Sequence, residues 1–292
     1  MSAFGRAYHF ENESAPVFSD TAAAKLLSRE EYEQMKKYTL SGIDFFAPEK
    51  KTDFSSEREA LRYLINTHIA PTPLCRSAYC EKALKSAFST GTEQYVILGA
   101  GLDTFAFRES EISKKYKIYA VDHPKTLEDT LFRIKRAELE IPQNLTFVAV
   151  DFSSDSLKEK LLSSGFDPSK KTFFSWLGVS YYLSKSEIEG MLKSLSGIMA
   201  DGSTLLFDYA DEGLFLSGEK RVQNMLAMAA AGGEEMKSSF DYKSMELMLS
   251  DFGFLIYEIL TPRDIQEKII KNSDMTAFEH INYIQAVFKQ TL

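Results

Sequence analysis

The sequence predicts an α/β fold: an open sheet of seven strands, mostly parallel with an antiparallel C-terminal strand, preceded by an N-terminal helical part. After Thr92, short runs rich in β-branched and aromatic residues alternate with stretches of helical periodicity. The runs are apolar almost throughout, as strands are when helices cover both faces of a parallel sheet. Their spacing of about 25–30 residues is typical of strand–helix–strand units.

The first hundred residues contain helical patterns and loops. We therefore divide the chain into a helical extension that caps the core, residues 1–92, and an α/β core, residues 93–292. Apolar residues at helical spacing predict helices over 21–38, 56–69 and 77–88. Pro71-Thr72-Pro73 is expected to separate the last two, because proline resists helix interiors.

Seven runs are predicted to be the strands of the core. They cover 95–98, 118–121, 145–150, 172–177, 204–209, 254–260 and 283–288. Between the fourth and fifth runs, Ser184 and Glu187 form the pattern of a capping box, which predicts a helix that Asp201-Gly202 ends. The last run has no helix after it, so we expect that strand to be antiparallel.

Residues 219–240 interrupt the alternation before the sixth run. The segment is rich in methionine and alanine and contains Gly232-Gly233. One interpretation is a surface helix followed by a turn. The other is a mobile lid over a pocket, covering 211–241.

Charge and composition restrict the class of protein. The chain has 34 Lys and Arg against 42 Asp and Glu, a net charge of −8, which disfavours a general nucleic-acid partner. It contains no apolar run of about 18 residues, so we expect no membrane partner and a cytoplasmic location. Cys75 and Cys80 are too few for a disulfide scaffold or a four-ligand zinc site. The oligomeric state stays open.

The turn Gly99-Ala100-Gly101 directly follows the first predicted strand. Glycine permits a tight turn and lets the backbone approach a ligand closely. In open α/β sheets, ligands bind at the carboxyl ends of strands, where the strand order reverses. The third glycine of a dinucleotide fingerprint would fall at position 104, which is Thr104, and this argues against NAD.

Two aspartates end the next predicted strands. Asp122 follows the glycine turn by about 20 residues, where a carboxylate can accept hydrogen bonds from both ribose hydroxyls. Asp151 ends the third run, where it could meet an adenine amino group. The alternative for each is a cap on the following helix.

Four motifs together resemble the leucine carboxyl methyltransferase family over roughly residues 15–288. The first starts with Leu98-Gly99-Ala100-Gly101-Leu102-Asp103-Thr104 and continues to Arg108; the others are Val121-Asp122-His123-Pro124, Val150-Asp151-Phe152 and the segment 176–183. The resemblance implies a class I methyltransferase (Rossmann-like) fold. It also implies S-adenosylmethionine as the cofactor and a small-molecule methyl acceptor.

The resemblance also implies a set of cofactor-binding residues. Arg76 matches the arginine that binds the carboxylate of the cofactor, with Arg62 as the alternative; a guanidinium grips a carboxylate through two hydrogen bonds. The remaining cofactor-binding residues are those of the motifs, namely Gly99, Ala100, Gly101, Asp103, Asp122, His123, Asp151, Phe152 and Leu177. Eukaryotic members usually have a glutamate where this chain has Leu177. The ammonium group of the cofactor must then meet backbone carbonyls near Gly99, and the protein-phosphatase substrate of those members is not carried over.

The acceptor atom is expected to be an oxygen of a carboxylate or hydroxyl. A carboxylate needs no general base at neutral pH, and the sequence offers no convincing one. His9 and His68 are read as structural or surface residues, His123 as a residue oriented by the turn before Pro124, and His280 precedes the last strand. Tyr181 and Tyr182 either orient the substrate or simply pack. No metal is expected, although Asp151 and Asp208 could hold magnesium. The other functions that the sequence allows are a nicotinamide-dependent oxidoreductase and a non-catalytic binding protein.

Overall fold

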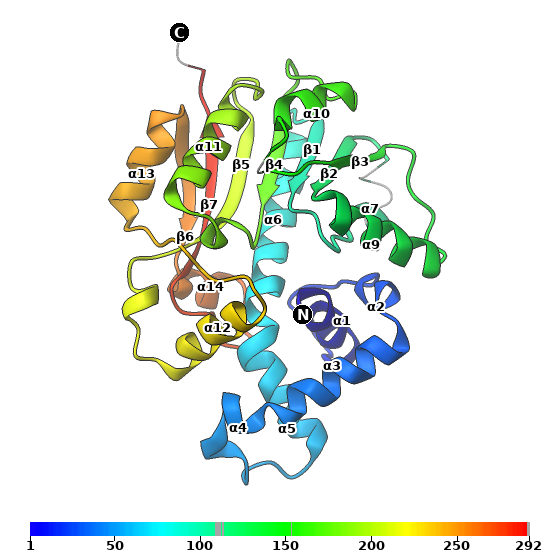
Figure 1. The fold of residues 1–292 in the computed structure, drawn as a ribbon, viewed down its shortest axis with the longest axis vertical. Helices are drawn as coiled ribbons and strands as arrows, with labels where there is room; N and C mark the ends of the chain where they lie inside the picture. The colour runs from blue at the N-terminus through cyan, green and yellow to red at the C-terminus, as the bar shows by residue number, and fades with distance from the viewer. Residues whose placement is uncertain (109–111, 113, 153, 291–292) are drawn as a thin grey trace.

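The computed structural model describes residues 1–108, 112, 114–152 and 154–290. Its centre is one seven-stranded sheet with helices on both sides (Figure 1). The strands are β1 (Gln94–Leu98), β2 (Lys117–Asp122), β3 (Leu145–Ala149), β4 (Thr172–Trp176), β5 (Thr204–Ala210), β6 (Phe254–Leu260) and β7 (Ile281–Phe288). All seven predicted strands are present, and their bounds differ by at most two residues from the prediction.

The strand order is β3-β2-β1-β4-β5-β7-β6, and β7 runs opposite to the other six strands. The predicted fold class is therefore confirmed. The order reverses between β1 and β4, which is where ligands bind in open α/β sheets. Leu98, the last residue of β1, pairs with Val121 of β2 and Trp176 of β4, so these three strands end at nearly the same level.

The two faces of the sheet contribute to two hydrophobic cores. Along β1, Tyr95 and Ile97 belong to one core, and Val96 and Leu98 to the other, as the alternation of a strand requires. The first core also contains side chains of the N-terminal helices α1 (Ser2–Asn12) and α6 (Pro71–Ser89). The helical part is thus joined to one face of the sheet through shared apolar contacts.

The first predicted helix, 21–38, is wrong in extent. The structure has two helices there, α2 (Ala23–Leu26) and α3 (Arg29–Ser41). Ser28 accepts a hydrogen bond from the Glu31 backbone N–H, and the Glu31 side chain accepts one from the Ser28 N–H. This capping box starts a new helix and overrides the continuous apolar pattern.

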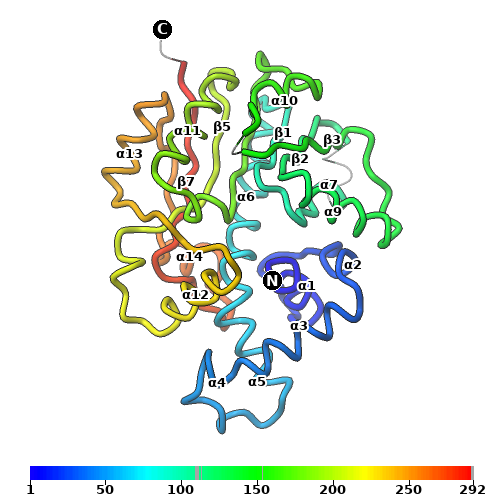
Figure 2. Tube along the Cα trace, in the orientation of Figure 1, coloured from blue at the N-terminus to red at the C-terminus, as the bar shows by residue number. Residues whose placement is uncertain are grey.

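The second and third predicted helices are also corrected. Residues 56–69 form α5 (Glu57–Leu64), which continues into a π-helical segment, η2 (Ile65–Ile69). Pro71 does not separate η2 from the next helix by a loop, because it is the first residue of α6 itself. Proline is tolerated there, since the first N–H groups of a helix have no partner within it. The short α4 (Ile43–Phe46) and η1 (Pro48–Lys50) complete this part of the chain, shown in blue in Figure 2.

The capping box predicted at Ser184 and Glu187 is confirmed at the start of α11 (Lys185–Ser196). The helix ends at Ser196 with Gly197 as its C-cap, earlier than predicted, and Gly202 instead forms the turn before β5 with a φ of 76°. The other short elements of the core are α7 (Phe105–Arg108), α9 (Pro124–Arg136), α10 (Leu157–Ser163), η3 (Ser180–Tyr182), η4 (Leu214–Leu216), α13 (Tyr242–Asp251) and α14 (Pro262–Lys268).

The segment before β6 forms a helix and a turn. Helix α12 (Lys220–Ala231) is followed by Gly232-Gly233. The segment is attached at both ends, because Asn224 donates to the Phe45 carbonyl and the Lys237 N–H donates to the Tyr181 carbonyl. Its motion as a lid stays a prediction. No helix in the described part of the chain is both long and apolar enough to cross a membrane.

Candidate functional site

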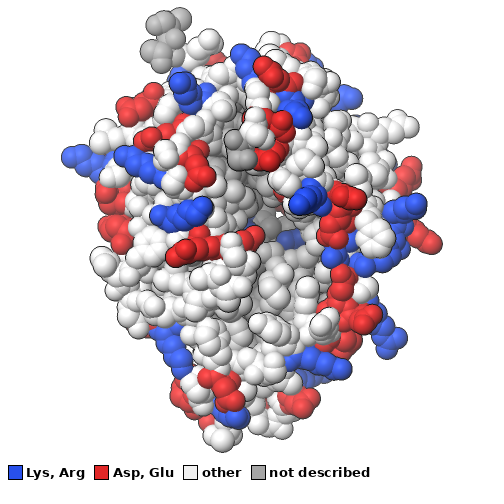
Figure 3. All heavy atoms as spheres, viewed as in Figure 1, with Lys and Arg blue, Asp and Glu red and all other residues white. Residues whose placement is uncertain are grey.

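A cavity of about 760 Å³ lies at the carboxyl ends of β1, β2 and β4. Its walls come from the loops after these strands and from α1, α6, α12 and the turn after α12. Figure 3 shows a hollow near the middle of the face that is turned to the viewer in Figure 1, among side chains of both charges. The cavity lies at the predicted place, the reversal point of the sheet.

The glycine turn forms the floor of this cavity. Gly99 and Gly101 have φ angles of 71° and 48°, in the left-handed region that favours glycine. A Cβ at Gly99 would lie 2.8 Å from Val179 Cγ2, whereas a Cβ at Gly101 would meet nothing within 4 Å. The first glycine is therefore needed for close packing, and the second leaves open space beside the backbone.

Asp122 binds the glycine turn directly. Its Oδ2 accepts a hydrogen bond of 2.7 Å from the Gly101 N–H, and its Oδ1 accepts one of 2.7 Å from the His123 N–H. Asp122 is not the cap of α9, because His123 holds that position and accepts from the Lys125 N–H. The carboxylate lines the cavity, and each oxygen keeps a lone pair for a ligand.

Arg76 reaches the same cavity from α6. Its Nη1 donates to the Tyr181 hydroxyl at 3.1 Å and to Asp208 Oδ2 at 3.3 Å, and Asp208 Oδ1 accepts from the Gly178 N–H at 2.6 Å. Burial opposes the charge of Arg76, but Tyr181 and Asp208 raise its pKa, so the guanidinium stays cationic. A Cβ at Gly178 would overlap Arg76 Nη1. Arg76 is thus a buried cation held in one place.

The partner of Arg76 was missed by sequence reasoning. Asp208 lies in β5, is fully buried and contacts Arg76, where the sequence allowed it as a magnesium ligand together with Asp151. Among the described residues no three His, Cys, Asp or Glu side chains form a group that could hold a metal ion. Arg62, the alternative to Arg76, pairs with Glu13 and Asp274 and does not line the cavity.

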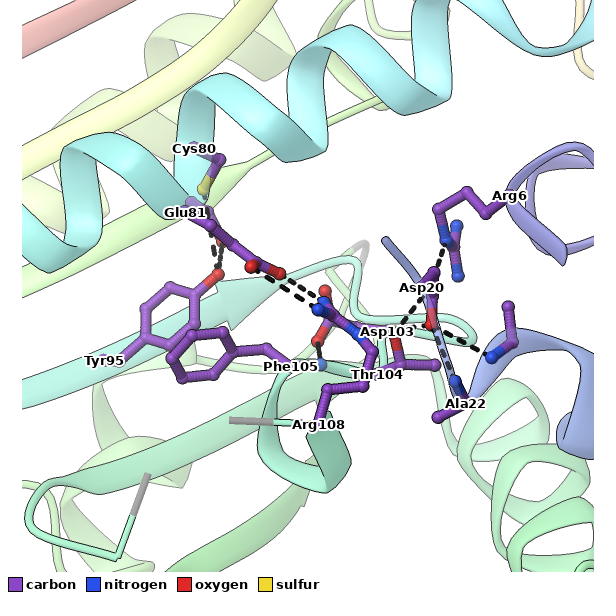
Figure 4. Close-up of polar contacts among 12 residues, drawn as sticks. Arg6, Asp20, Ala22, Cys80, Glu81, Tyr95, Asp103, Thr104, Phe105 and Arg108 are labelled. Carbon is purple, nitrogen blue, oxygen red and sulfur yellow. Dashed lines mark hydrogen bonds and ion pairs between the residues drawn. The ribbon is translucent and has the colours of Figure 1, made fainter. Parts of the chain in front are cut away.

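A buried polar network joins the N-terminal helices to the loop after the glycine turn (Figure 4). Asp20 accepts hydrogen bonds from Arg6 Nε at 2.7 Å and from the Thr104 hydroxyl at 2.8 Å. Arg108 donates to Thr104 Oγ1 at 2.8 Å and forms an ion pair with Asp20 at 3.2 Å. Arg6 also donates to the Leu102 carbonyl. Thr104 therefore has a structural reason to replace the glycine of a dinucleotide fingerprint.

Of the other predicted cofactor residues, some line the cavity and others do not. Ala100, Asp103, Phe152 and Leu177 line the cavity. Asp103 is partly buried, the loss of solvent raises its pKa, and its Oδ1 accepts from the Phe105 N–H. His123 and Asp151 do not line the cavity; they lie beside each other, with His123 Nε2 3.8 Å from Asp151 Oδ2. Their role as cofactor contacts stays a prediction that this cavity does not support.

The aromatic and imidazole side chains of the cavity offer no strong base. Tyr181 and Tyr182 both line it, with ring centroids 4.7 Å apart, and burial raises both pKa values. His68 also lines it. Burial and the charge of Arg221 lower the pKa of His68 to about 4. His9 is structural as predicted, because it is buried and accepts from the Val17 N–H.

Comparison with known proteins gives one sequence family and one fold. The profile of the leucine carboxyl methyltransferase family matches residues 1–196. YktD of Bacillus subtilis strain 168, which carries the name of an S-adenosyl-L-methionine-dependent methyltransferase, is 42% identical over 99% of this chain and 96% of its own length. A similarly named protein of Mycolicibacterium paratuberculosis is 30% identical over 44% of this chain and 41% of its own length. The crystal structure of a DUF574 family protein from Streptomyces avermitilis superposes with a TM-score of 0.60 over 99% of this chain and 97% of that one, at 11% identity, which shows a shared fold.

Proposed function

The chain belongs to the leucine carboxyl methyltransferase family and is an S-adenosylmethionine-dependent methyltransferase, and we propose that it methylates an oxygen of a small molecule, a carboxylate or a hydroxyl. The observation that carries this proposal is the convergence of the glycine turn, Asp122 and Arg76 on one cavity. These residues come from three different elements. Each matches one part of the cofactor.

The residues present fit S-adenosylmethionine. The open space beside Gly101 admits a nucleoside close to the backbone, and the Asp122 carboxylate accepts hydrogen bonds from ribose hydroxyls. Arg76 would hold the carboxylate of the methionine part through charge-assisted hydrogen bonds. Leu177 offers no charge to the ammonium group, so backbone carbonyls near Gly99 would take that contact. When bound, the cofactor supplies an activated methyl group.

The rest of the chemistry is positioning. An acceptor held in the right orientation reacts as if at very high concentration, so the cavity walls need only align its oxygen. The lowered pKa of His68 and the raised pKa of Tyr181 leave both groups poor bases near pH 7. This supports an acceptor oxygen that is already ionised or acidic, such as a carboxylate or an acidic hydroxyl. We propose that Tyr181 and Tyr182 orient that acceptor.

Titration calorimetry with S-adenosylhomocysteine and with NADH tests the cofactor. We expect saturable binding of S-adenosylhomocysteine below millimolar concentration and none of NADH. NADH binding alone would favour an oxidoreductase, and binding of neither would favour a non-catalytic protein. Transfer of radiolabelled methyl from S-adenosylmethionine to a panel of small carboxylic acids, phenols and amines then tests the acceptor atom. Labelling confined to the amines would contradict O-methylation.

A further inference from the structure

A second cavity of about 190 Å³ adjoins the first, and we call it the side chamber. The two cavities share five lining residues, among them His68 and Tyr182, so the side chamber opens from the larger cavity. Its walls are mostly apolar, with Phe46, Met225 and Phe278 among them. An apolar cavity of about 150 Å³ is enough for benzene. The side chamber is therefore the right size for one aromatic ring with a small substituent.

Two residues that line the side chamber each carry a buried nitrogen atom without a hydrogen-bond partner. Five buried side-chain nitrogen or oxygen atoms in the described part of the chain have none, and two of these, His68 Nε2 and Arg221 Nε, are in residues that line this small space. Most buried polar groups in folded proteins are hydrogen-bonded. Two residues with an unpaired nitrogen around one small cavity favour a ligand that carries a polar group.

The Arg221 side chain is fixed by its other nitrogens. Nη1 donates to the Ala277 carbonyl at 3.1 Å and to Glu279 Oε1 at 3.2 Å, and Nη2 donates to the Thr276 carbonyl at 2.9 Å. The guanidinium also lies 4.8 Å from the ring centre of Phe278. Arg221 cannot turn to find a partner for Nε without breaking these contacts.

His68 is presented by an irregular backbone. It lies in the π-helical segment η2. Such segments are rare in proteins, but those that occur are often at functional sites. Its ring lies 4.9 Å from the ring of Phe46. At neutral pH the imidazole is uncharged, because burial and Arg221 lower its pKa to about 4, so it carries one N–H.

We propose that the side chamber binds the non-reacting end of the methyl acceptor, an aromatic ring that bears a carboxylate. One carboxylate oxygen accepts from Arg221 Nε and the other from His68 Nε2, in the tautomer with hydrogen on that atom. The ring lies among Phe46, Met225 and Phe278, and the reacting oxygen, at the opposite end of the molecule, faces the larger cavity. We choose a carboxylate because Arg221 is a cation and because Arg221 Nε and His68 Nε2 are two hydrogen-bond donors. The statement that the bound molecule is the methyl acceptor rests on the proposed function. The binding of an aromatic carboxylate in the side chamber does not.

Calorimetry of the full chain saturated with S-adenosylhomocysteine tests the inference with benzoate as the probe. We expect benzoate to bind at least tenfold more tightly than benzamide, which has the same shape without the charge. Arg221→Met should lower the affinity for benzoate at least tenfold. The matched control is Arg263→Met, an exposed arginine on α14 paired with Glu267, which should leave the affinity unchanged.

A second variant tests the chamber without touching Arg221. Ala229 lines the side chamber and not the larger cavity, whereas Ala227 lies on the same helix and is exposed. Ala229→Phe should fill the chamber and remove benzoate binding while S-adenosylhomocysteine still binds, and Ala227→Phe should change neither. If wild-type protein binds S-adenosylhomocysteine but not benzoate, or if benzamide binds equally well, or if neither variant weakens benzoate, the inference is overturned. If S-adenosylhomocysteine fails to bind, the proposed function fails, and benzoate titrated into the protein alone still decides the inference.

Discussion

Gly178 leaves the space in which the guanidinium of Arg76 lies. Its φ is 72°, and a Cβ there would overlap Arg76 Nη1. Gly91 has a φ of 98° and no atom within 4 Å of its would-be Cβ. Gly178→Ala and Gly91→Ala therefore share a backbone penalty of about 1–2 kcal/mol, but only the first displaces Arg76. We expect Gly178→Ala alone to weaken S-adenosylhomocysteine binding at least tenfold in calorimetry, with urea unfolding as the check on stability. Equal affinities of the two variants would show that Arg76 does not hold the cofactor.

The Asp122 carboxylate both fixes the glycine turn and faces the cavity. We expect Asp122→Ala to weaken S-adenosylhomocysteine binding by about 1–3 kcal/mol, through loss of charge-assisted hydrogen bonds. Asp129→Ala on the exposed side of α9, where Asp129 pairs with Arg133, is the control and should bind normally. Calorimetry that finds the Asp122 variant unchanged would move the ribose site elsewhere.

Single residues of the site were predictable where a motif follows a strand. The glycine turn, Asp122 and Leu177 each lie at the end of a predicted strand, and the fold places such positions at the cavity. The roles of Asp208 and His68 could not be predicted in this way. Asp208 acts through its ion pair with Arg76, and His68 through its proximity to Arg221, and each partner is more than one hundred residues away in the chain. A single sequence does not encode such pairs in any local pattern.

Asp20 joins two elements, the loop after α1 and the loop before α7. Burial alone would raise its pKa, but the nearby Arg6 and Arg108 outweigh burial and lower it. Asp20→Asn should cost about 3–5 kcal/mol of unfolding free energy at pH 7, because it leaves the buried Arg6 without its counter-charge and removes one of the two carboxylates that pair with Arg108. Urea unfolding measures this loss. The control is Asp44→Asn, which removes an exposed ion pair with Lys51 and should cost only about 0–1 kcal/mol of unfolding free energy.

The same aspartate predicts a pH dependence with a definite sign. A carboxyl group whose pKa is lower in the folded state stabilises the protein above its unfolded pKa of about 4 and loses that contribution as the pH falls further. The difference in unfolding free energy between wild type and Asp20→Asn should therefore be constant from pH 7 to about 5 and shrink below about 4. A difference that stays constant down to pH 3 would exclude the ion pairs as its cause.

Elements were predicted well where the apolar pattern is the main signal. All seven strands were found, because buried strands are recognisable from continuous apolar runs. The helices of the N-terminal part were predicted less accurately. Ser28 begins a new helix where the apolar pattern is continuous, and Pro71 begins a helix where proline was expected to separate two helices. The π-helical turn at His68 has no sequence signal, because its residues are equally compatible with an ordinary helix.

At the scale of the whole molecule, the helical part and the sheet share one hydrophobic core. Phe4 and Leu74 belong to the same core as Tyr95 and Phe173. We expect a single unfolding transition, although the boundary at residue 92 stays a prediction. The fluorescence of Trp176, the one tryptophan, reports on β4, and far-ultraviolet circular dichroism reports mainly on the helices. The two urea curves should coincide. An earlier transition in circular dichroism would show that the helical part unfolds separately.

The cavity described above takes its walls from both ends of the chain, from Ser2 and Arg6 to Phe278 and Ile281. During synthesis the N-terminal helices leave the ribosome long before β7, and contacts between such distant segments form late in folding. A nascent chain that already contains the glycine turn therefore has no complete cavity until β7 has emerged. Ligand binding would then distinguish chains that contain β7 from shorter ones, and it would protect only the former from proteases.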